Sequence, residues 1–189
     1  GLTFTNLAAG NYNIVITDAT GCSHTLVTSV SNLNAPLINS ITSNDISCYG
    51  GSNGSISIGA TGGTGILQFS INNGQNFVAA SVFNNLSAGT YSIVIIDANN
   101  CVSTGNITLN QPDQLVLNSL EIPSTCGNAN GQIQTLVTGG TLPVQYSINN
   151  GATYQNQSVF NNLAQGNYQI LITDAEGCTT TTSQTVTNI

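Results

Sequence analysis

The amino-acid sequence predicts an all-β protein built of tandem Ig-like β-sandwich repeats. Three observations support this prediction. One segment recurs three times at intervals of about 77 residues. Short runs of alternating apolar and polar residues are separated by turns rich in Gly and Asn. The polar residues are mostly Asn, Thr, Ser, Gln and Gly, which favour strands, turns and loops over helices.

The recurring segment ends each repeat and aligns without a gap. Its three copies run from Phe4 to Cys22, from Phe83 to Cys101 and from Phe160 to Cys178. Each copy keeps Leu, Gly, Tyr, an aliphatic run and Asp at the same positions. A repeat of about 77 residues is near the lower limit for a self-supporting core, so a covalent cross-link would help to stabilise it.

A second recurring block begins at Cys48 and again at Cys126, and it continues through Gly-x-Ile, Gly-Gly-Thr and Ser-Ile-Asn-Asn-Gly. The chain therefore contains one truncated repeat followed by two complete ones. Pro36 and Pro112 interrupt the strand pattern and mark the boundaries. We divide the sequence into a first repeat, a second repeat and a third repeat, comprising residues 1–34, 35–111 and 112–189.

Each complete repeat is expected to hold about six strands. In the second repeat these strands are predicted over residues 37–46, 54–60, 67–72, 77–82, 90–97 and 102–109. Asn73-Gly74 is a strong turn signal between the third and fourth strands. In the fifth strand Tyr91, Ile93 and Ile95 share one face while Val94 and Ile96 line the other, which predicts a central strand covered on both sides.

The charge balance excludes several classes of function. The chain has no Lys or Arg against seven acidic residues, for a net charge of −7. Nucleic-acid binding and electrostatic attraction to anionic lipid both require cationic side chains. Hydrophobic residues make up 40% of the chain, which argues against disorder, and no apolar run is long enough for membrane insertion. No cofactor motif is present.

Five cysteines allow two regular pairings. Pairing within repeats gives Cys48–Cys101 and Cys126–Cys178 and leaves Cys22 unpaired in this fragment. Pairing across boundaries gives Cys22–Cys48 and Cys101–Cys126 and leaves Cys178. Counting strand reversals favours the first scheme, because it places both partners at the same end of a repeat. The alternatives are buried free thiols and metal ligation, but no Cys-x-x-Cys pair or partnering His supports a metal site.

The full pattern resembles the SprB repeat. It is Cys, Gly-Ser-Ile, Gly-Gly-Thr, Ser-Ile-Asn-Asn-Gly and Leu-x-x-Gly-x-Tyr-x-Ile-x-Ile-x-Asp-Ala-x-x-Cys, carried by Cys48–Cys101 and Cys126–Cys178. The resemblance implies a very large extracellular adhesin of gliding Bacteroidota, attached to the outer membrane, exported by the type IX system and moved by the gliding machinery. The aromatic Tyr-x-Trp pair common in the family's third strand is replaced by Leu67-Gln-Phe69 and Val144-Gln-Tyr146, which argues against ligand binding through exposed aromatics.

Asp18, Asp97 and Asp174 recur in the Asp-Ala-x-x-Cys motif. They are interpreted as turn residues whose carboxylates accept backbone N–H groups. The alternative is a calcium ligand at a junction between repeats, but calcium requires several clustered oxygen ligands and the acidic residues are dispersed.

Other candidate sites have structural interpretations. His24 could suggest a hydrolase triad, but it occurs in only one of the repeats and is expected to be an exposed strand residue. A row of tyrosines could bind sugar, but alternation with Ile favours a core position for Tyr12, Tyr91 and Tyr168. The sequence therefore predicts no enzyme and no metal or cofactor. It predicts a structural and adhesive stalk whose partners are neighbouring repeats and an external surface or polysaccharide. The alternative is a carbohydrate-binding module of a secreted multidomain protein.

Overall fold

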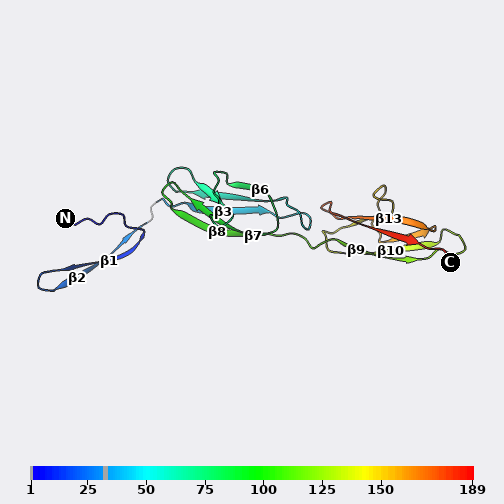
Figure 1. Ribbon diagram of the computed structural model, residues 1–189, viewed down its shortest axis with the longest axis horizontal. Coiled ribbons are helices and arrows are strands. Elements are labelled where there is room, and N and C mark those ends of the chain that lie inside the picture. The colour runs from blue at the N-terminus through cyan, green and yellow to red at the C-terminus, as the bar shows by residue number, and fades with distance from the viewer. Residues whose placement is uncertain (1, 32–33) are drawn as a thin grey trace. The chain divides into compact units, whose positions relative to one another are not determined.

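The computed structural model describes residues 2–31 and 34–189 and confirms the all-β prediction (Figure 1). The described residues form no helix long and apolar enough to cross a membrane. The strands are β1 (Gly10–Thr17), β2 (Ser23–Val30), β3 (Leu37–Asn44), β4 (Gly54–Thr61), β5 (Gln68–Ser70), β6 (Val82–Leu86), β7 (Gly89–Ile96), β8 (Val102–Leu109), β9 (Val116–Ile122), β10 (Gly131–Thr138), β11 (Gln145–Ser147), β12 (Val159–Leu163), β13 (Gly166–Thr173) and β14 (Thr179–Val186).

The two complete repeats share one sheet topology. In the second repeat the sheets have the orders β3-β4-β6 and β5-β7-β8, and in the third repeat the orders are β9-β10-β12 and β11-β13-β14. The predicted fifth strand corresponds to β7 and is central in its sheet, as expected from its two apolar faces. The first repeat contributes the antiparallel hairpin β1–β2.

The core of the third repeat explains why these strands form a sandwich. Ile133 on β10 and Ile170 and Ile172 on β13 are fully buried and belong to one hydrophobic cluster. Because β10 and β13 lie in different sheets, the inward faces of both sheets share this core. The alternation of buried and exposed residues along each strand follows directly from the strand period of two.

The predicted fourth strand, residues 77–82, is wrong in its extent. Val78 makes only an isolated antiparallel bridge with Phe69, and the chain then changes sheets. Ser81 O already accepts a hydrogen bond from Ile58 N at 2.9 Å, and β6 pairs with β4 from Val82 onward. The chain therefore reverses direction once more than the sequence pattern indicated, because apolar alternation does not reveal which sheet a strand joins.

The chain divides into two compact units. The first comprises residues 1–40, 58–81 and 92–105, and the second comprises residues 41–57, 82–91 and 106–189. Strands β1, β2 and β5 belong wholly to the first unit, and β6 and β9 to β14 belong wholly to the second. The sequence division into repeats 1–34, 35–111 and 112–189 stays a prediction. Gly1 and residues 32–33 of its first segment lie outside the described residues.

Within the second unit, the first and last strands of a repeat end side by side. Ile46 N, just beyond β3, donates to Asn110 O, just beyond β8, at 2.9 Å. In the third repeat Ser124 N donates to Thr187 O at 2.9 Å, and Ile189 N donates to Ser124 O at 2.9 Å. This end of each repeat carries the loop cysteine, Cys48 or Cys126, defined here as the cysteine that follows the first strand of the repeat.

Candidate functional site

A disulfide joins the second repeat to the third. It links Cys48, beyond the end of β3, to Cys178, just before β14, across a sequence separation of 130 residues. The Cα atoms are 5.6 Å apart, which is typical of a disulfide. This pairing corrects both predicted schemes. Cys48 bonds neither to Cys101 nor to Cys22, and Cys178 does not bond to Cys126.

The length of the last strand explains why the predicted pairing within repeats fails. In the third repeat Cys126 N donates to Ile189 O at 3.0 Å, beyond the end of β14, whereas Cys178 directly precedes β14. A strand of eight residues covers about 26 Å, several times the Cα separation that a disulfide allows. In the second repeat β8 likewise lies between Cys101 and the Asn110 that pairs with the end of β3. The prediction counted one reversal too few because it missed β6.

The loop of Cys48 is held by its own residues and by the linker to the third repeat. Gly51 N donates to Cys48 O at 2.9 Å and closes a tight turn. The Asn53 side chain accepts from Ser47 N at 3.2 Å and donates to Ser47 Oγ at 2.8 Å. Gly50 N donates to Gln111 Oε1 at 2.8 Å. Because Gln111 adjoins Pro112, this contact fixes the loop against the start of the linker, the segment 111–115 that leads into β9.

The turn of Cys178 is organised by a buried aspartate. Asp174 is 6% exposed, and its Oδ1 accepts the backbone N–H groups of Glu176 at 3.0 Å and Cys178 at 2.8 Å. Its Oδ2 accepts Thr141 N at 2.9 Å. The carboxylate therefore positions the backbone of Cys178 directly. We call Cys22, Cys101 and Cys178 the turn cysteines, since each follows the aspartate of this motif.

The same aspartate turn occurs in the other two repeats. Asp97 Oδ1 accepts Asn99 N at 2.9 Å and Cys101 N at 2.8 Å, and its Oδ2 accepts Thr64 N at 2.9 Å. Asp18 Oδ1 accepts Thr20 N at 2.8 Å and Cys22 N at 3.0 Å. These carboxylates are occupied by donors of the chain itself. No group of three or more His, Cys, Asp or Glu residues suited to a metal ion occurs in residues 2–31 and 34–189.

These hydrogen bonds lower the pKa of Asp97 and the pKa of Asp18. Burial acts to raise the pKa of Asp97, but the N–H groups of Thr64, Cys101 and Asn99 together outweigh burial and hold that pKa below its usual value. At Asp18 the Thr20 hydroxyl contributes most to lowering the pKa. Both aspartates are thus ionised at neutral pH and act as acceptors only.

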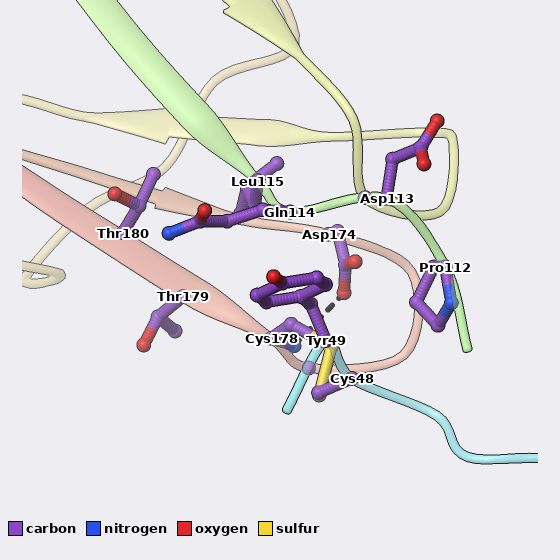
Figure 2. A pocket seen from close by; sticks show the side chains of 12 residues that line it. Cys48, Tyr49, Pro112, Asp113, Gln114, Leu115, Asp174, Cys178, Thr179 and Thr180 are labelled. Carbon is purple, nitrogen blue, oxygen red and sulfur yellow. Dashed lines mark hydrogen bonds between the residues drawn. A yellow bond between two sulfur atoms is a disulfide. The ribbon is translucent and has the colours of Figure 1, made fainter. Parts of the chain in front are cut away.

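An open hollow of about 420 Å³ adjoins the disulfide. Figure 2 shows the Tyr49 ring beside the bridge, with Leu115 and Asp174 on the third-repeat side of the hollow. Tyr49 is 54% exposed, so its ring is accessible, while Leu115 belongs to the core of the third repeat. Cys178 Sγ lies 3.4 Å from Ser47 O. The geometry is that of a covalent joint between two repeats.

The recurring tyrosines have a structural use that the sequence pattern did not reveal. Each hydroxyl donates to the carbonyl four residues earlier, Tyr12 to Ala8 at 2.7 Å, Tyr91 to Ser87 at 2.8 Å and Tyr168 to Ala164 at 3.0 Å. All three rings are half-buried, and Tyr168 packs against the core. These hydroxyl hydrogen bonds therefore stabilise the turns that precede β1, β7 and β13. His24 lies exposed on β2.

Comparisons with known proteins gave one family match and several solved structures of low similarity. A family model described as the SprB repeat matches residues 40–76 and 123–153. No curated protein matches the chain. Three solved structures are similar to it at low identity, and their TM-scores are near 0.3.

The first of these structures is an amphioxus IgVJ-C2 molecule, with 11% identity and a TM-score of 0.32 over 82% of this chain and 97% of that one. The second is protocadherin gamma B7 extracellular cadherin domains 1–4, with 10% identity and a TM-score of 0.31 over 97% of this chain and 65% of that one. The third comprises fibronectin(III)-like modules of Clostridium thermocellum CbhA, with 12% identity and a TM-score of 0.31 over 79% and 95%. The family matches fall at equivalent places in the second and third repeats, and each of these repeats therefore contains a segment that matches the SprB repeat.

Proposed function

We propose that this chain is a structural and adhesive stalk segment of a long repetitive filament used in surface adhesion and gliding. The observation that supports the proposal most directly is the disulfide from Cys48 to Cys178, which joins successive repeats. By resemblance to the family, the filament is attached to the outer membrane, exported by the type IX system and moved by the gliding machinery. Its external partner is a surface or a polysaccharide.

The position of the disulfide suits a chain that is pulled from its two ends. Force follows the shortest covalent route, which runs from the first repeat to Cys48, across the bridge to Cys178 and on through β14. The 130-residue span between the two cysteines is bypassed, and it contains strands β4 to β13. Tension can therefore strip only the outer strands, while most of both repeats stays protected from extension.

Composition supports the same role. A chain without Lys cannot form the Lys–Asn isopeptide bonds that reinforce some bacterial surface fibres. Resistance to tension must then come from the antiparallel ladders and from disulfides. A chain without Lys or Arg also has no site for trypsin, which suits a surface exposed to proteases.

Single-molecule pulling from the two termini tests this proposal. The oxidised chain should extend by about 200 Å, because only the residues outside the 130-residue loop can unravel at roughly 3.4 Å each. The Cys48→Ser variant should extend by about 640 Å, since all 189 residues can then unravel. Cys126→Ser is the matched control and should behave as the parent chain. Equal extensions for the parent and Cys48→Ser would refute a tension-bearing joint.

A further inference from the structure

Cys126 occupies the place in the third repeat that Cys48 occupies in the second. It directly follows Thr125, as Cys48 follows Ser47, at the end where the first and last strands meet. Thr125 and Asn130 exchange hydrogen bonds at 2.8 and 2.7 Å, in the pattern of Ser47 and Asn53. Cys126 is exposed and forms no disulfide.

The contact between this loop and the end of the repeat also recurs. Gly127 N donates to Asn188 Oδ1 at 2.9 Å, just as Gly50 N donates to the Gln111 side chain. Asn188 therefore corresponds to Gln111, the residue before the linker. The loop of Cys126 therefore has the same kinds of hydrogen bond as the loop of Cys48, whose cysteine forms a disulfide. This equivalence is the observation that assigns a disulfide partner to Cys126.

The turn cysteine, which is the second partner in the observed disulfide, recurs as well. Each turn cysteine donates its backbone N–H to the aspartate four residues earlier, at 3.0 Å for Cys22, 2.8 Å for Cys101 and 2.8 Å for Cys178. Every repeat thus presents a turn cysteine in one geometry, and each complete repeat adds a loop cysteine at its other end. In the one junction between complete repeats, the loop cysteine of the earlier repeat bonds to the turn cysteine of the later one.

We propose that Cys126 forms a disulfide with the turn cysteine of a following repeat, so that the loop-to-turn bridge joins each pair of successive repeats along the array. The two thiols lose two protons and two electrons, and a disulfide oxidant takes them up and becomes two thiols. Cys126 cannot use the turn cysteine of its own repeat, because β14 separates it from Cys178. The inference requires only the observed bridge and the sequence repeat, and it does not depend on adhesion or gliding.

A chain extended by one repeat tests the proposal. A copy of residues 113–189 is fused directly after Ile189, which aligns with Pro112 when Asn188 aligns with Gln111. The copy carries Thr179→Ser, an exposed position next to Cys178, so that peptides with the appended Cys178 differ in mass from those with the original Cys178. The protein is folded with a mixture of reduced and oxidised glutathione, and its disulfides are mapped by non-reducing pepsin digestion and mass spectrometry. We expect a bond from Cys126 to the Cys178 of the appended copy, beside the bond from Cys48 to the original Cys178.

The matched control is Cys126→Ser in the extended chain. It should leave the appended Cys178 as a thiol or a glutathione adduct and keep the bond from Cys48 to the original Cys178. That retained bond shows in the same map that oxidation was sufficient. The proposal is overturned if Cys126 of the extended chain remains a thiol, bonds to the Cys178 of its own repeat or links two molecules. None of these results would affect the extension experiment, which depends on Cys48 alone.

Discussion

Asp97 shows how single residues control the turns that carry the cysteines. Its carboxylate accepts three backbone N–H groups, and these bonds lower its pKa in the folded chain. A lowered folded pKa contributes stability that is present above the unfolded value of about 3.9 and is lost as the pH falls through the folded pKa. The pKa of Asp45, lowered by the Asn110 N–H, acts in the same direction.

We therefore predict that the free energy of unfolding stays level from neutral pH to about pH 4 and decreases below it. Urea unfolding followed by tyrosine fluorescence between pH 7 and pH 2 measures this. Asp97→Asn should be less stable than the parent at pH 7, because one amide oxygen replaces two carboxylate acceptors. It should also lose less stability than the parent on acidification. Parallel pH profiles for the two proteins would contradict the role given to Asp97.

The sequence predicts such residue roles well when the interaction is local. An aspartate two and four residues before its N–H partners leaves a pattern that can be read directly, as at Asp18 and Asp174. The third bond, from Thr141 to Asp174, spans 33 residues and leaves no local pattern. The tyrosine hydroxyl bonds are local too, but the alternation of Tyr168 with Ile indicated burial and gave no sign of its carbonyl partner.

At the scale of elements, Gly131 shows why the second strand of a complete repeat, here β10, begins with glycine. A Cβ atom there would lie 2.6 Å from Val186 Cγ1 and 2.9 Å from Leu163 O. The neighbours belong to β14 and β12, so the added atom would push apart strands from both sheets of the sandwich. Gly54 has the corresponding contacts in the second repeat, with Leu109 and Leu86.

Gly131→Ala should therefore reduce the free energy of unfolding of the third repeat by about 1–3 kcal/mol through overpacking. Gly166→Ala is the matched control, because a Cβ there would meet only Tyr168 Cε2, at 4.0 Å. We expect that control to stay within about 0.5 kcal/mol of the parent in the same urea titration. A Gly131→Ala protein as stable as Gly166→Ala would show that the strands shift freely to accept the methyl group.

Strand positions were predictable from alternation, whereas the assignment of strands to sheets was not. Ile93 and Ile95 on β7 alternate cleanly and are buried as expected. The change of sheet before β6 depends on the hydrogen bond from Ile58 to Ser81, which joins residues distant in sequence. One missed reversal inverted the predicted direction of β7 and moved Cys101 to the wrong end of the repeat.

At the scale of the whole molecule, the disulfide links two successive repeats covalently, so that neither is an independent unit. Each sandwich has its own core, as the cluster around Ile133 and Ile170 shows for the third repeat. In ordinary tandem arrays stability is a sum of local terms and nearest-neighbour contacts. Here a covalent bond adds to those contacts, and no pattern inside one repeat could reveal it. The positions of the cysteines in the sequence are compatible with bonding within a repeat and with bonding between repeats. Only the end of the repeat at which each strand terminates in space distinguishes the two pairings.

The bridge should stabilise the folded pair through the unfolded chain. Closing a loop of 130 residues restricts the unfolded state, and removal of the bridge is expected to cost about 5 kcal/mol. We predict that the double variant Cys48→Ser/Cys178→Ser unfolds at lower urea than the parent. Its second and third repeats should also unfold more independently, because unfolding one no longer leaves it tethered to the other at a second point. Cys126→Ser controls for replacing a cysteine by serine without removing the bridge, and it should match the parent. If the double variant and the parent share one midpoint and one slope, the bridge carries tension without contributing to equilibrium stability, and its role is confined to the pulled chain.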